Sequence, residues 1–412
     1  MRIGFPLTNK DSLCLKRTYK QSESPIILFT MNNLVDIDDK KQLNKIGKEN
    51  YPEIIIDFSN NINGEMIINV NYNDSLSKER KKKEKNVNPY SKNIIILYFD
   101  SVSRSTGIRQ LKKTVKFFEQ FMPYKGNLNK KYPSENFHSF QFFKYHSFYF
   151  YTHGNYPKLF YGKNKSNNMT RITKYLKENG YITAFSNDMC LRDSCWMPHD
   201  MSFEEICDHE LILCDPNRKP TNSMIKKCLY NKINAGHQYE YGIQFWRKYK
   251  NNRRFLLIVN NDGHEGTLEI LKYDDDIVFN FLNSLYNENL LKETTILLLS
   301  DHGCPMPSVY YFNTFFQLDK DLPMLFLFIP DKKNTLYSRQ YKYIYENQQK
   351  FITSYDIYNT ILYLIYGNQY FNQNVPKSKL GKVLFGPINP KRTPYNYKSM
   401  SKKTCIIIKK KN

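Results

Sequence analysis

Residues 93–103 read NIIILYFDSVS, and the run IIILYF before the aspartate is the stretch that decides the fold. The run has the length of a strand, and it lacks the alternation of apolar and polar residues that marks a strand with one solvated face. An uninterrupted apolar strand is typical of a parallel sheet with helices on both faces. The run therefore predicts a buried strand that ends at Asp100.

Three more apolar runs of strand length follow along the chain, namely FLLIV at 255–259, TILLL at 295–299 and LFLFI at 325–329. Helix-length stretches separate them, and within residues 274–291 the side chains of Ile277, Phe281 and Leu285 share one helical face. Strands that alternate with helices predict an α/β domain in which a central, mostly parallel sheet lies between two helical layers.

The first ninety residues have a different character. Short strand-like runs occur at 26–29, 54–56 and 66–70, followed by the charged stretch KERKKKEK at 78–85. We predict a small β-rich appendage with a charged linker over residues 1–90, an α/β domain over residues 91–390 and a basic tail over residues 391–412.

The chain has 412 residues, of which 41% are hydrophobic, and a formal net charge of +22. This content is enough for a large core. The basic residues gather at only three places, 78–85, 112–116 and 409–411, and are otherwise dispersed among abundant Asn, Ile and Tyr. An AT-rich coding sequence produces this composition whatever the function. The sequence shows no nucleic-acid-binding signature, so we expect no specific nucleic-acid partner.

Five of the eight cysteines lie close together, at Cys190, Cys195, Cys207, Cys214 and Cys228. They form no CxxC pair and no zinc-finger spacing with histidine, which disfavours a structural zinc site. Disulfides and reduced thiols both remain open. The N-terminus lacks the apolar core of a signal peptide, and no run of about 18 apolar residues occurs, so the sequence predicts a soluble chain without a membrane span.

Polar residues follow directly after three of the predicted strands. They are Asp100, the segment NNDGH at 260–264, and the segment SDHG at 300–303. Ligands of open parallel sheets bind at the carboxyl ends of the strands. Carboxylates and imidazoles held together are ligands for divalent cations such as Zn²⁺ or Mn²⁺. The sequence therefore predicts a metal site of Asp100, Asp301 and His302.

Taken in order, five segments resemble the alkaline phosphatase superfamily. They are NIIILYFDSVSR, FFKYHSFYFYTHGNYPKLFYG, NNDGHEGTLEILKYDDD, TTILLLSDHG and DLPMLFLFIPD. The resemblance covers roughly residues 90–385 and is greatest to a little-characterised, sulfatase-like group of animals and protists. It implies an alkaline-phosphatase-like three-layer sandwich and metal-assisted attack by a side-chain nucleophile on a phosphate or sulfate ester. It also implies an extracellular or secretory-pathway location.

The resemblance places the nucleophile at Thr152, within YTHGNYP at 151–157. A threonine hydroxyl needs a cation or a base to become nucleophilic. A helix cap is the structural alternative for Thr152, and Ser147 is the alternative nucleophile. The C/S-x-P-x-R motif of typical sulfatases is absent from the sequence, which disfavours their mechanism. We assign substrate binding to Asn155 and to Arg104, whose guanidinium suits an anionic group.

His264 has two open roles, as ligand of a second metal or as hydrogen-bond donor to the substrate. Two-metal relatives have a late histidine, but no histidine follows His302, and Asn260 stands where they have an aspartate. We therefore predict one divalent cation (Zn²⁺, Mn²⁺ or Ca²⁺), with a second as the alternative and Asp262 as an additional candidate ligand. The remaining histidines are predicted to be structural, except that His153 lies beside Thr152.

These observations predict a metal-dependent hydrolase or transferase that acts on phosphate or sulfate esters through Thr152. The alternative is a catalytically inactive binding protein with the same fold, which the departures from the two-metal pattern favour. The expected partner is an anionic ester. Its identity, the oligomeric state and the disulfide pattern do not follow from the sequence.

Overall fold

The computed structural model describes residues 27–28, 54–57, 65–123, 136–163, 172–188, 207–213, 228–229, 232–264, 269–304, 319–331, 339–372, 374–397 and 400. Eight strands form a central sheet in the order β1-β7-β6-β10-β4-β11-β12-β5. Their bounds are β1 Ile27–Leu28, β4 Asn93–Phe99, β5 Phe137–Gln141, β6 Tyr181–Asn187, β7 His209–Leu213, β10 Arg253–Asn260, β11 Thr294–Ser300 and β12 Leu325–Pro330.

The apolar runs become the middle of this sheet. Strand β4 lies between β10 and β11, pairs with both in parallel, and has every residue buried. Strands β6 and β7 continue the parallel set, whereas β12 pairs antiparallel with β11. Because both faces of the central strands are covered, no alternation of polar and apolar residues is needed.

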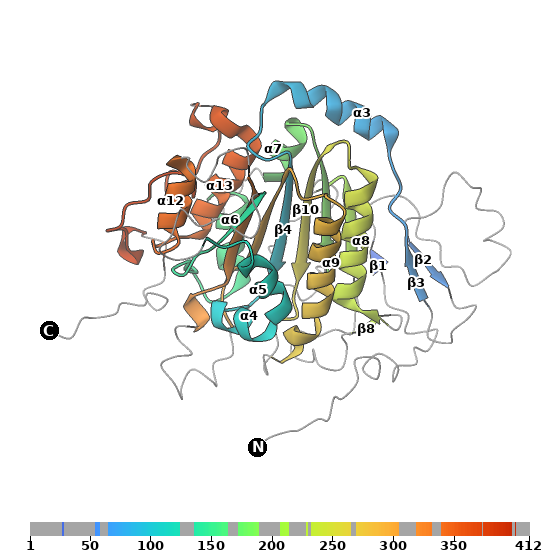
Figure 1. Cartoon of the computed structure of the whole chain (residues 1–412), viewed down its shortest axis with the longest axis horizontal. Helices are drawn as coiled ribbons and strands as arrows, with labels where there is room; N and C mark the ends of the chain where they lie inside the picture. Colours follow the sequence, from blue (N-terminus) through green and yellow to red (C-terminus); the bar gives the residue numbers. More distant parts are fainter. Residues whose placement is uncertain are drawn as a thin grey trace, which may run out of the picture.

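Helices cover the two faces of the sheet (Figure 1). One layer contains α6 (Thr152–Phe160), α7 (Ile172–Glu178), α12 (Arg339–Asn347) and α13 (Ser354–Tyr366). The other contains α5 (Lys112–Glu119), α8 (Asn234–Lys248) and α9 (Asp275–Asn287), with α4 (Arg104–Gln110) beside α5. The predicted three-layer sandwich with a mostly parallel sheet is confirmed. No helix among the described residues is long and apolar enough to cross a membrane.

The charged stretch that we predicted as a linker is helical. Helix α3 (Asp74–Lys83) runs along one end of the sandwich (Figure 1) and continues as the 3-10 helix η2 (Glu84–Asn86). Its Arg80 is buried and pairs with the buried Asp208 at 2.6 Å. Charge alone misled the prediction, because a single buried arginine fixes a helix whose other charged side chains face water.

The strands of the predicted β-rich segment belong to two different sheets. Strands β2 (Ile54–Asp57) and β3 (Glu65–Ile68) form a hairpin, while β1 joins the large sheet beside β7. Met66, Ile68 and Val70 are buried in the same core as helix α8. Gln244 of α8 also accepts a hydrogen bond from the Val70 amide at 3.1 Å. The β3 segment is therefore packed on the sandwich, and the domain limits stay a prediction.

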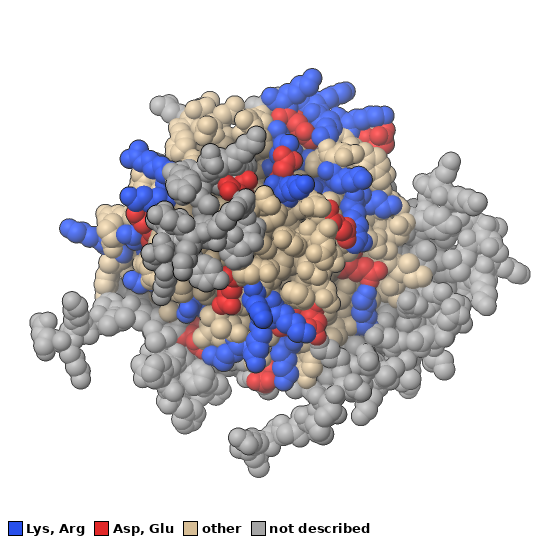
Figure 2. Space-filling model, in the orientation of Figure 1, with Lys and Arg blue, Asp and Glu red and all other residues tan. Residues whose placement is uncertain are grey.

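Lysine and arginine side chains gather over α3 and over the region of α4 and α5 in Figure 2. Several of those on α3 are paired within the helix, as Lys78 is with Asp74 at 2.5 Å and Lys83 with Glu79 at 2.6 Å. Lys113 of α5 likewise pairs with Asp276 at 2.5 Å. Acidic partners thus offset part of the positive charge at two of the three basic clusters.

Strand directions bring a distant segment to the carboxyl ends of the parallel strands. Because β12 is antiparallel to both β11 and β5, strand β5 runs in the same direction as β4 and β11. The chain leaving β5 at Gln141 therefore emerges where β4 and β11 end, and it reaches α6 eleven residues later, at Thr152. That end of the sheet holds the candidate site.

Candidate metal centre and nucleophile

The predicted ligands meet at the carboxyl ends of two neighbouring strands. Phe99 of β4 is in register with Ser300 of β11, so the residues that follow them, Asp100 and Asp301, leave the sheet side by side. One donor atom from each of Asp100, Asp301 and His302 lies within 4.8 Å of the other two, and all three residues are buried. The sequence prediction that these three side chains converge agrees with the structure.

Hydrogen bonds join the turn after β4 to the segment after β11 that carries Asp301 and His302. Ser101 has a φ of 63°, in the left-handed region that non-glycine residues seldom occupy. Beyond this turn the Val102 amide donates to Ser300 Oγ at 2.9 Å, and Ser300 Oγ donates to the His302 carbonyl at 2.8 Å. The Ser300 hydroxyl therefore ties the two strand ends together and fixes the backbone of the metal-binding segment.

The hydrogen bonds of His302 define which ring nitrogen faces the cluster. Its Nδ1 lies 2.6 Å from the Gly303 carbonyl, which can only accept, so Nδ1 carries a proton and Nε2 is the nitrogen that faces the cluster. Nε2 lies 3.4 Å from Asp301 Oδ2 and 3.5 Å from Asp100 Oδ1. A cation bound between these three atoms would take the Nε2 lone pair and both carboxylate oxygens as ligands.

Asp301 supplies the second indication of a cation. Its side chain is 1% exposed, and its Oδ2 has no hydrogen-bond partner in the part of the chain that the structure describes. Burial raises the pKa of Asp301; His302 opposes this effect, and the nearby charge of Asp100 adds to it. A buried carboxylate oxygen without a donor costs free energy that a bound cation would offset. The residues present thus fit a divalent cation with carboxylate and imidazole ligands.

Thr152 is the first residue of α6 and points into the same cluster. Its Oγ1 donates to Asp100 Oδ1 at 3.0 Å and lies 3.3 Å from His302 Nε2. The N-cap of this helix is Tyr151, which makes no side-chain capping hydrogen bond. The hydroxyl of Thr152 is therefore directed at the predicted metal ligands and does not cap the helix.

Asn155 holds the loop that leads to Thr152. Its Oδ1 accepts from the Phe148 and Tyr149 amides at 2.8 and 3.2 Å, while its Nδ2 donates to the Tyr149 and Tyr151 carbonyls at 2.6 and 3.1 Å. The side chain has no exposed surface. These contacts give Asn155 a positioning role in this structure, and its assignment to substrate binding stays a prediction.

Arg104 lies at the start of α4, and its guanidinium stacks on the ring of Phe143 at 4.7 Å. Its Nε is buried without a hydrogen-bond partner among the described residues, and burial lowers the pKa of the guanidinium. A half-buried arginine with an unused donor is able to accept an anionic group. Its role in substrate binding stays a prediction.

His264 and Asp262 lie on the turn after β10. A side chain at Gly263 would collide with the Asp100 carbonyl, because an added Cβ would lie 2.4 Å from that oxygen. This close approach places the turn against the metal-binding segment. Asp262 is buried, yet it does not belong to the group of Asp100, Asp301 and His302. The roles of His264 and Asp262 therefore stay predictions.

Asn260, at the end of β10, has structural contacts. Its Nδ2 donates to Asp274 Oδ2 at 3.1 Å, and its Oδ1 accepts from the Asp262 amide at 2.9 Å. The carboxamide connects the end of β10 to the start of α9 and uses both its donor and its acceptor in doing so.

Ser147 and the other histidines occupy varied positions. Ser147 is fully buried before α6, and His153 is exposed with its ring stacked on Tyr151 at 4.1 Å. Four further histidines are buried away from the Asp-Asp-His group, at His138, His146, His209 and His237. His199 lies outside the described residues, as do Cys190, Cys195 and Cys214.

Sequence reasoning missed three residues that shape the site. Ser101 donates from Oγ to Asp100 Oδ1 at 3.0 Å, and Ser300 bridges the strand ends. Tyr98 is fully buried, and burial together with the carboxylates of Asp301 and Asp100 raises its pKa well above the usual value. Alternation along β4 places Tyr98 on the same face as Asp100, which is the signal that could have identified it. The roles of Ser101 and Ser300 depend on the conformation of the turn after β4, which the sequence does not reveal.

The sequence model of a family described as "Protein of unknown function (DUF229)" matches residues 154–407, which is more than half of the chain. The chain belongs to the DUF229 family. This match confirms the predicted resemblance to a domain-of-unknown-function group. The matched DUF229 region includes His264, Asp301 and His302, whereas Asp100 and Thr152 precede it.

Solved structures similar to this DUF229 chain have low sequence identity to it. The C-terminal periplasmic domain of EcEptC from Escherichia coli, in complex with Zn, is 10% identical; the alignment covers 74% of this chain and 91% of that one, with a TM-score of 0.46. The lipoteichoic acid synthase LtaP from Listeria monocytogenes is 12% identical, with 75% and 80% covered and a TM-score of 0.41.

A protein in the alkaline phosphatase superfamily from Vibrio parahaemolyticus is 13% identical, with 78% of this chain and 80% of that chain covered and a TM-score of 0.46. No curated protein matches the sequence of this chain. The substrate and mechanism of this DUF229 chain must therefore be argued from its own residues.

Proposed function

We propose that this chain is a metal-dependent hydrolase or transferase that acts on phosphate or sulfate esters with Thr152 as the nucleophile. The observation that carries the proposal is the contact of Thr152 Oγ1 with both Asp100 Oδ1, at 3.0 Å, and His302 Nε2, at 3.3 Å. A hydroxyl directed at a buried group of metal-binding side chains is the arrangement that activates a weak nucleophile.

Asp100, Asp301 and His302 would hold one divalent cation, with Zn²⁺, Mn²⁺ and Ca²⁺ as the candidates. Such a cation supplies a lower pKa for the nucleophilic hydroxyl and neutralises charge on the ester. The buried Asp301 Oδ2, which accepts no hydrogen bond from a described residue, and the His302 Nε2 that faces it support this ligand set.

The chain's own residues supply the nucleophile and its positioning. In the proposed reaction the oxygen of Thr152 forms a bond to the phosphorus or sulfur, the bond to the ester oxygen breaks, and the proton lost by Thr152 balances the proton gained by the departing alcohol; water then releases the phosphate or sulfate from Thr152. Asn155 supports this geometry, because its four backbone hydrogen bonds hold the segment that precedes Thr152. Arg104 and His264 are proposed to bind the anionic group and the leaving group.

The second candidate function is a binding protein that keeps the metal site without turnover. Asn260 favours it, because this position carries no carboxylate and the side chain is committed to Asp274 and to the Asp262 amide. The two proposals differ in one observable, which is product release by a protein that has bound its metal.

The test is metal titration followed by turnover of an aryl phosphate, a bis-aryl phosphodiester and an aryl sulfate. We expect Thr152→Ala to lower kcat by on the order of 10³-fold or more, Thr152→Ser to retain part of the rate, and Ser147→Ala to change little. Stoichiometric metal binding without turnover of any ester would favour the binding protein. Loss of rate in Ser147→Ala but not in Thr152→Ala would overturn the assignment.

A further inference from the structure

A pocket lies at the end of the sheet opposite the metal centre, where β5 and β11 begin. It is lined by side chains from the start of β5, the end of α9, the loop before β11 and the end of β12, namely Asn136, Phe137, Tyr286, Asn287, Asn289, Lys292 and Asp331. The seven residues of β11 separate the two ends by about 20 Å, so the pocket is not part of the metal site.

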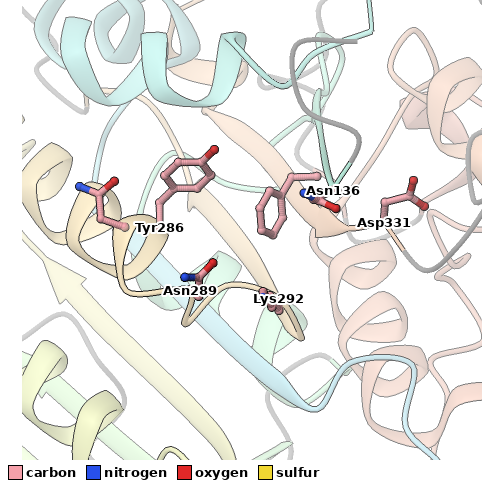
Figure 3. A pocket seen from close by; sticks show the side chains of 7 residues that line it. Asn136, Tyr286, Asn289, Lys292 and Asp331 are labelled. Atoms are coloured by element: carbon pink, nitrogen blue, oxygen red, sulfur yellow. The ribbon is translucent and has the colours of Figure 1, made fainter. Parts of the chain in front are cut away.

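The pocket has a volume of about 600 Å³, which lies in the range of small-molecule sites. Figure 3 shows Tyr286 and Asn289 on one side of the pocket and Asn136 and Asp331 on the other. Three carboxamides line it, and Lys292 and Asp331 carry opposite charges. A lining without excess charge suits a neutral polar ligand better than an anion.

The aromatic side chains of the pocket are packed against other rings. Phe137 stacks on Phe328 at 5.1 Å, and Tyr286 meets Phe137 at 5.8 Å and Phe121 at 5.7 Å. Tyr286 nevertheless keeps 38% of its surface exposed. A ring fixed on one side and open to solvent on the other offers a flat apolar face to a ligand at little entropic cost.

The backbone that carries the Asn289 carboxamide is fixed by the end of α9. Asn289 has a φ of 56°, and its amide donates to the Tyr286 carbonyl at 3.0 Å while the Leu290 amide donates to the Leu285 carbonyl at 2.9 Å. These two hydrogen bonds form the left-handed C-terminal motif of α9. The side chains of Asn287 and Asn289 make no hydrogen bond with any described residue.

We infer that this pocket binds a neutral sugar ring. A pyranose presents neighbouring hydroxyl groups that both donate and accept, and the carboxamides of Asn287 and Asn289 can do the same in return. Its C–H face is apolar and flat, and it matches the exposed ring of Tyr286. The site would hold a glycan far from Thr152, and this inference does not depend on the proposed reaction.

The test is calorimetric or saturation-transfer titration of the full chain with glucose, galactose, mannose and N-acetylglucosamine, up to tens of millimolar. We expect at least one sugar to bind, and Tyr286→Ala to weaken it about ten-fold or more. Because Tyr286 also packs on three other rings, the second variant is Asn289→Gly. Glycine tolerates the positive φ, so this change removes only the carboxamide and should weaken binding with little change in Tm.

Two controls locate the bound sugar. Tyr395→Ala removes a tyrosine that is 66% exposed elsewhere, and Asp301→Asn alters the metal centre, so neither should change sugar affinity. The inference fails if none of the four sugars binds. It also fails if binding survives Tyr286→Ala and Asn289→Gly but is lost in Asp301→Asn, or if inorganic phosphate binds at this pocket in place of a sugar.

Discussion

The two ends of the central strands carry polar residues in opposite electrostatic environments. At the carboxyl end, Asp100, Asp301 and His302 are buried, and like charges face one another. At the other end, Lys292 and Asp331 have opposite charges beside neutral amides that face water. Buried like charges are stabilised by a positive partner, whereas a balanced polar surface needs none. The first end is thus suited to a cation and an anionic ester, and the second to a neutral ligand.

The largest effect on stability is expected from a charge introduced in the middle of β11, between the two ends of the sheet. Leu298 lies in the middle of β11 and is fully buried. Leu298→Asp should lower the free energy of unfolding by about 4 kcal/mol or more, because an unpaired charge would enter the core, and it should disturb both ends of the sheet together. Thermal unfolding of this variant measures the effect.

Lys81→Ala is the control for that experiment, since Lys81 is an exposed residue of α3. It should change the stability by less than about 0.5 kcal/mol. An equal fall in Tm for Leu298→Asp and Lys81→Ala would contradict the buried position of β11.

The next effect concerns the ion pair that fixes α3. Arg80→Met leaves Asp208 buried with its charge less well compensated, and the free energy of unfolding should fall by about 3 kcal/mol. Lys82→Met, an exposed change on the same helix, should be nearly neutral. Chemical denaturation distinguishes the two variants. Equal midpoints would mean that α3 is not held by the buried pair.

Asp301→Asn should have opposite effects with and without metal. Without metal, the variant should be more stable than the wild type by about 1–3 kcal/mol, because it removes a buried carboxylate oxygen that lacks a partner. Its metal affinity should fall by at least about 100-fold. Unfolding in EDTA and in added Zn²⁺ or Mn²⁺ measures both effects. A metal-free variant less stable than the wild type would contradict the charge imbalance at this end of the sheet.

The last expected effect is a pH dependence at Asp321. Burial raises the pKa of this carboxyl to about 8, so the folded chain retains a proton that the unfolded chain releases near pH 4. The unfolded state therefore binds fewer protons between these values, and stability should fall as pH rises from about 4 to about 8.

Asp321→Asn should flatten that profile, whereas Asp276→Asn, at a more exposed carboxylate paired with Lys113, should leave it unchanged. Denaturation midpoints in EDTA over this pH range provide the measurement. A wild-type profile as flat as that of Asp321→Asn would show that Asp321 ionises normally in the folded chain.

Much of the fold could be read from local patterns. The runs IIILYF, FLLIV, TILLL and LFLFI each became a fully buried strand, since continuous apolar character directly reflects burial on both faces. The stretch at 78–85 was misread because its many charges hid Arg80, whose burial depends on Asp208, a residue far along the chain. Local composition cannot show a partner of this kind.

The sequence by itself determined which strands are buried and that Asp100, Asp301 and His302 follow two of them. Only the tertiary structure decided that these side chains converge with Thr152, because the antiparallel β12 sets the direction in which β5 delivers that residue. The position of His302 Nε2 beside Asp100 and the pocket at Tyr286 were likewise settled by contacts between distant segments. Burial follows from local apolar pattern, whereas the position of polar groups depends on strand order, direction and register.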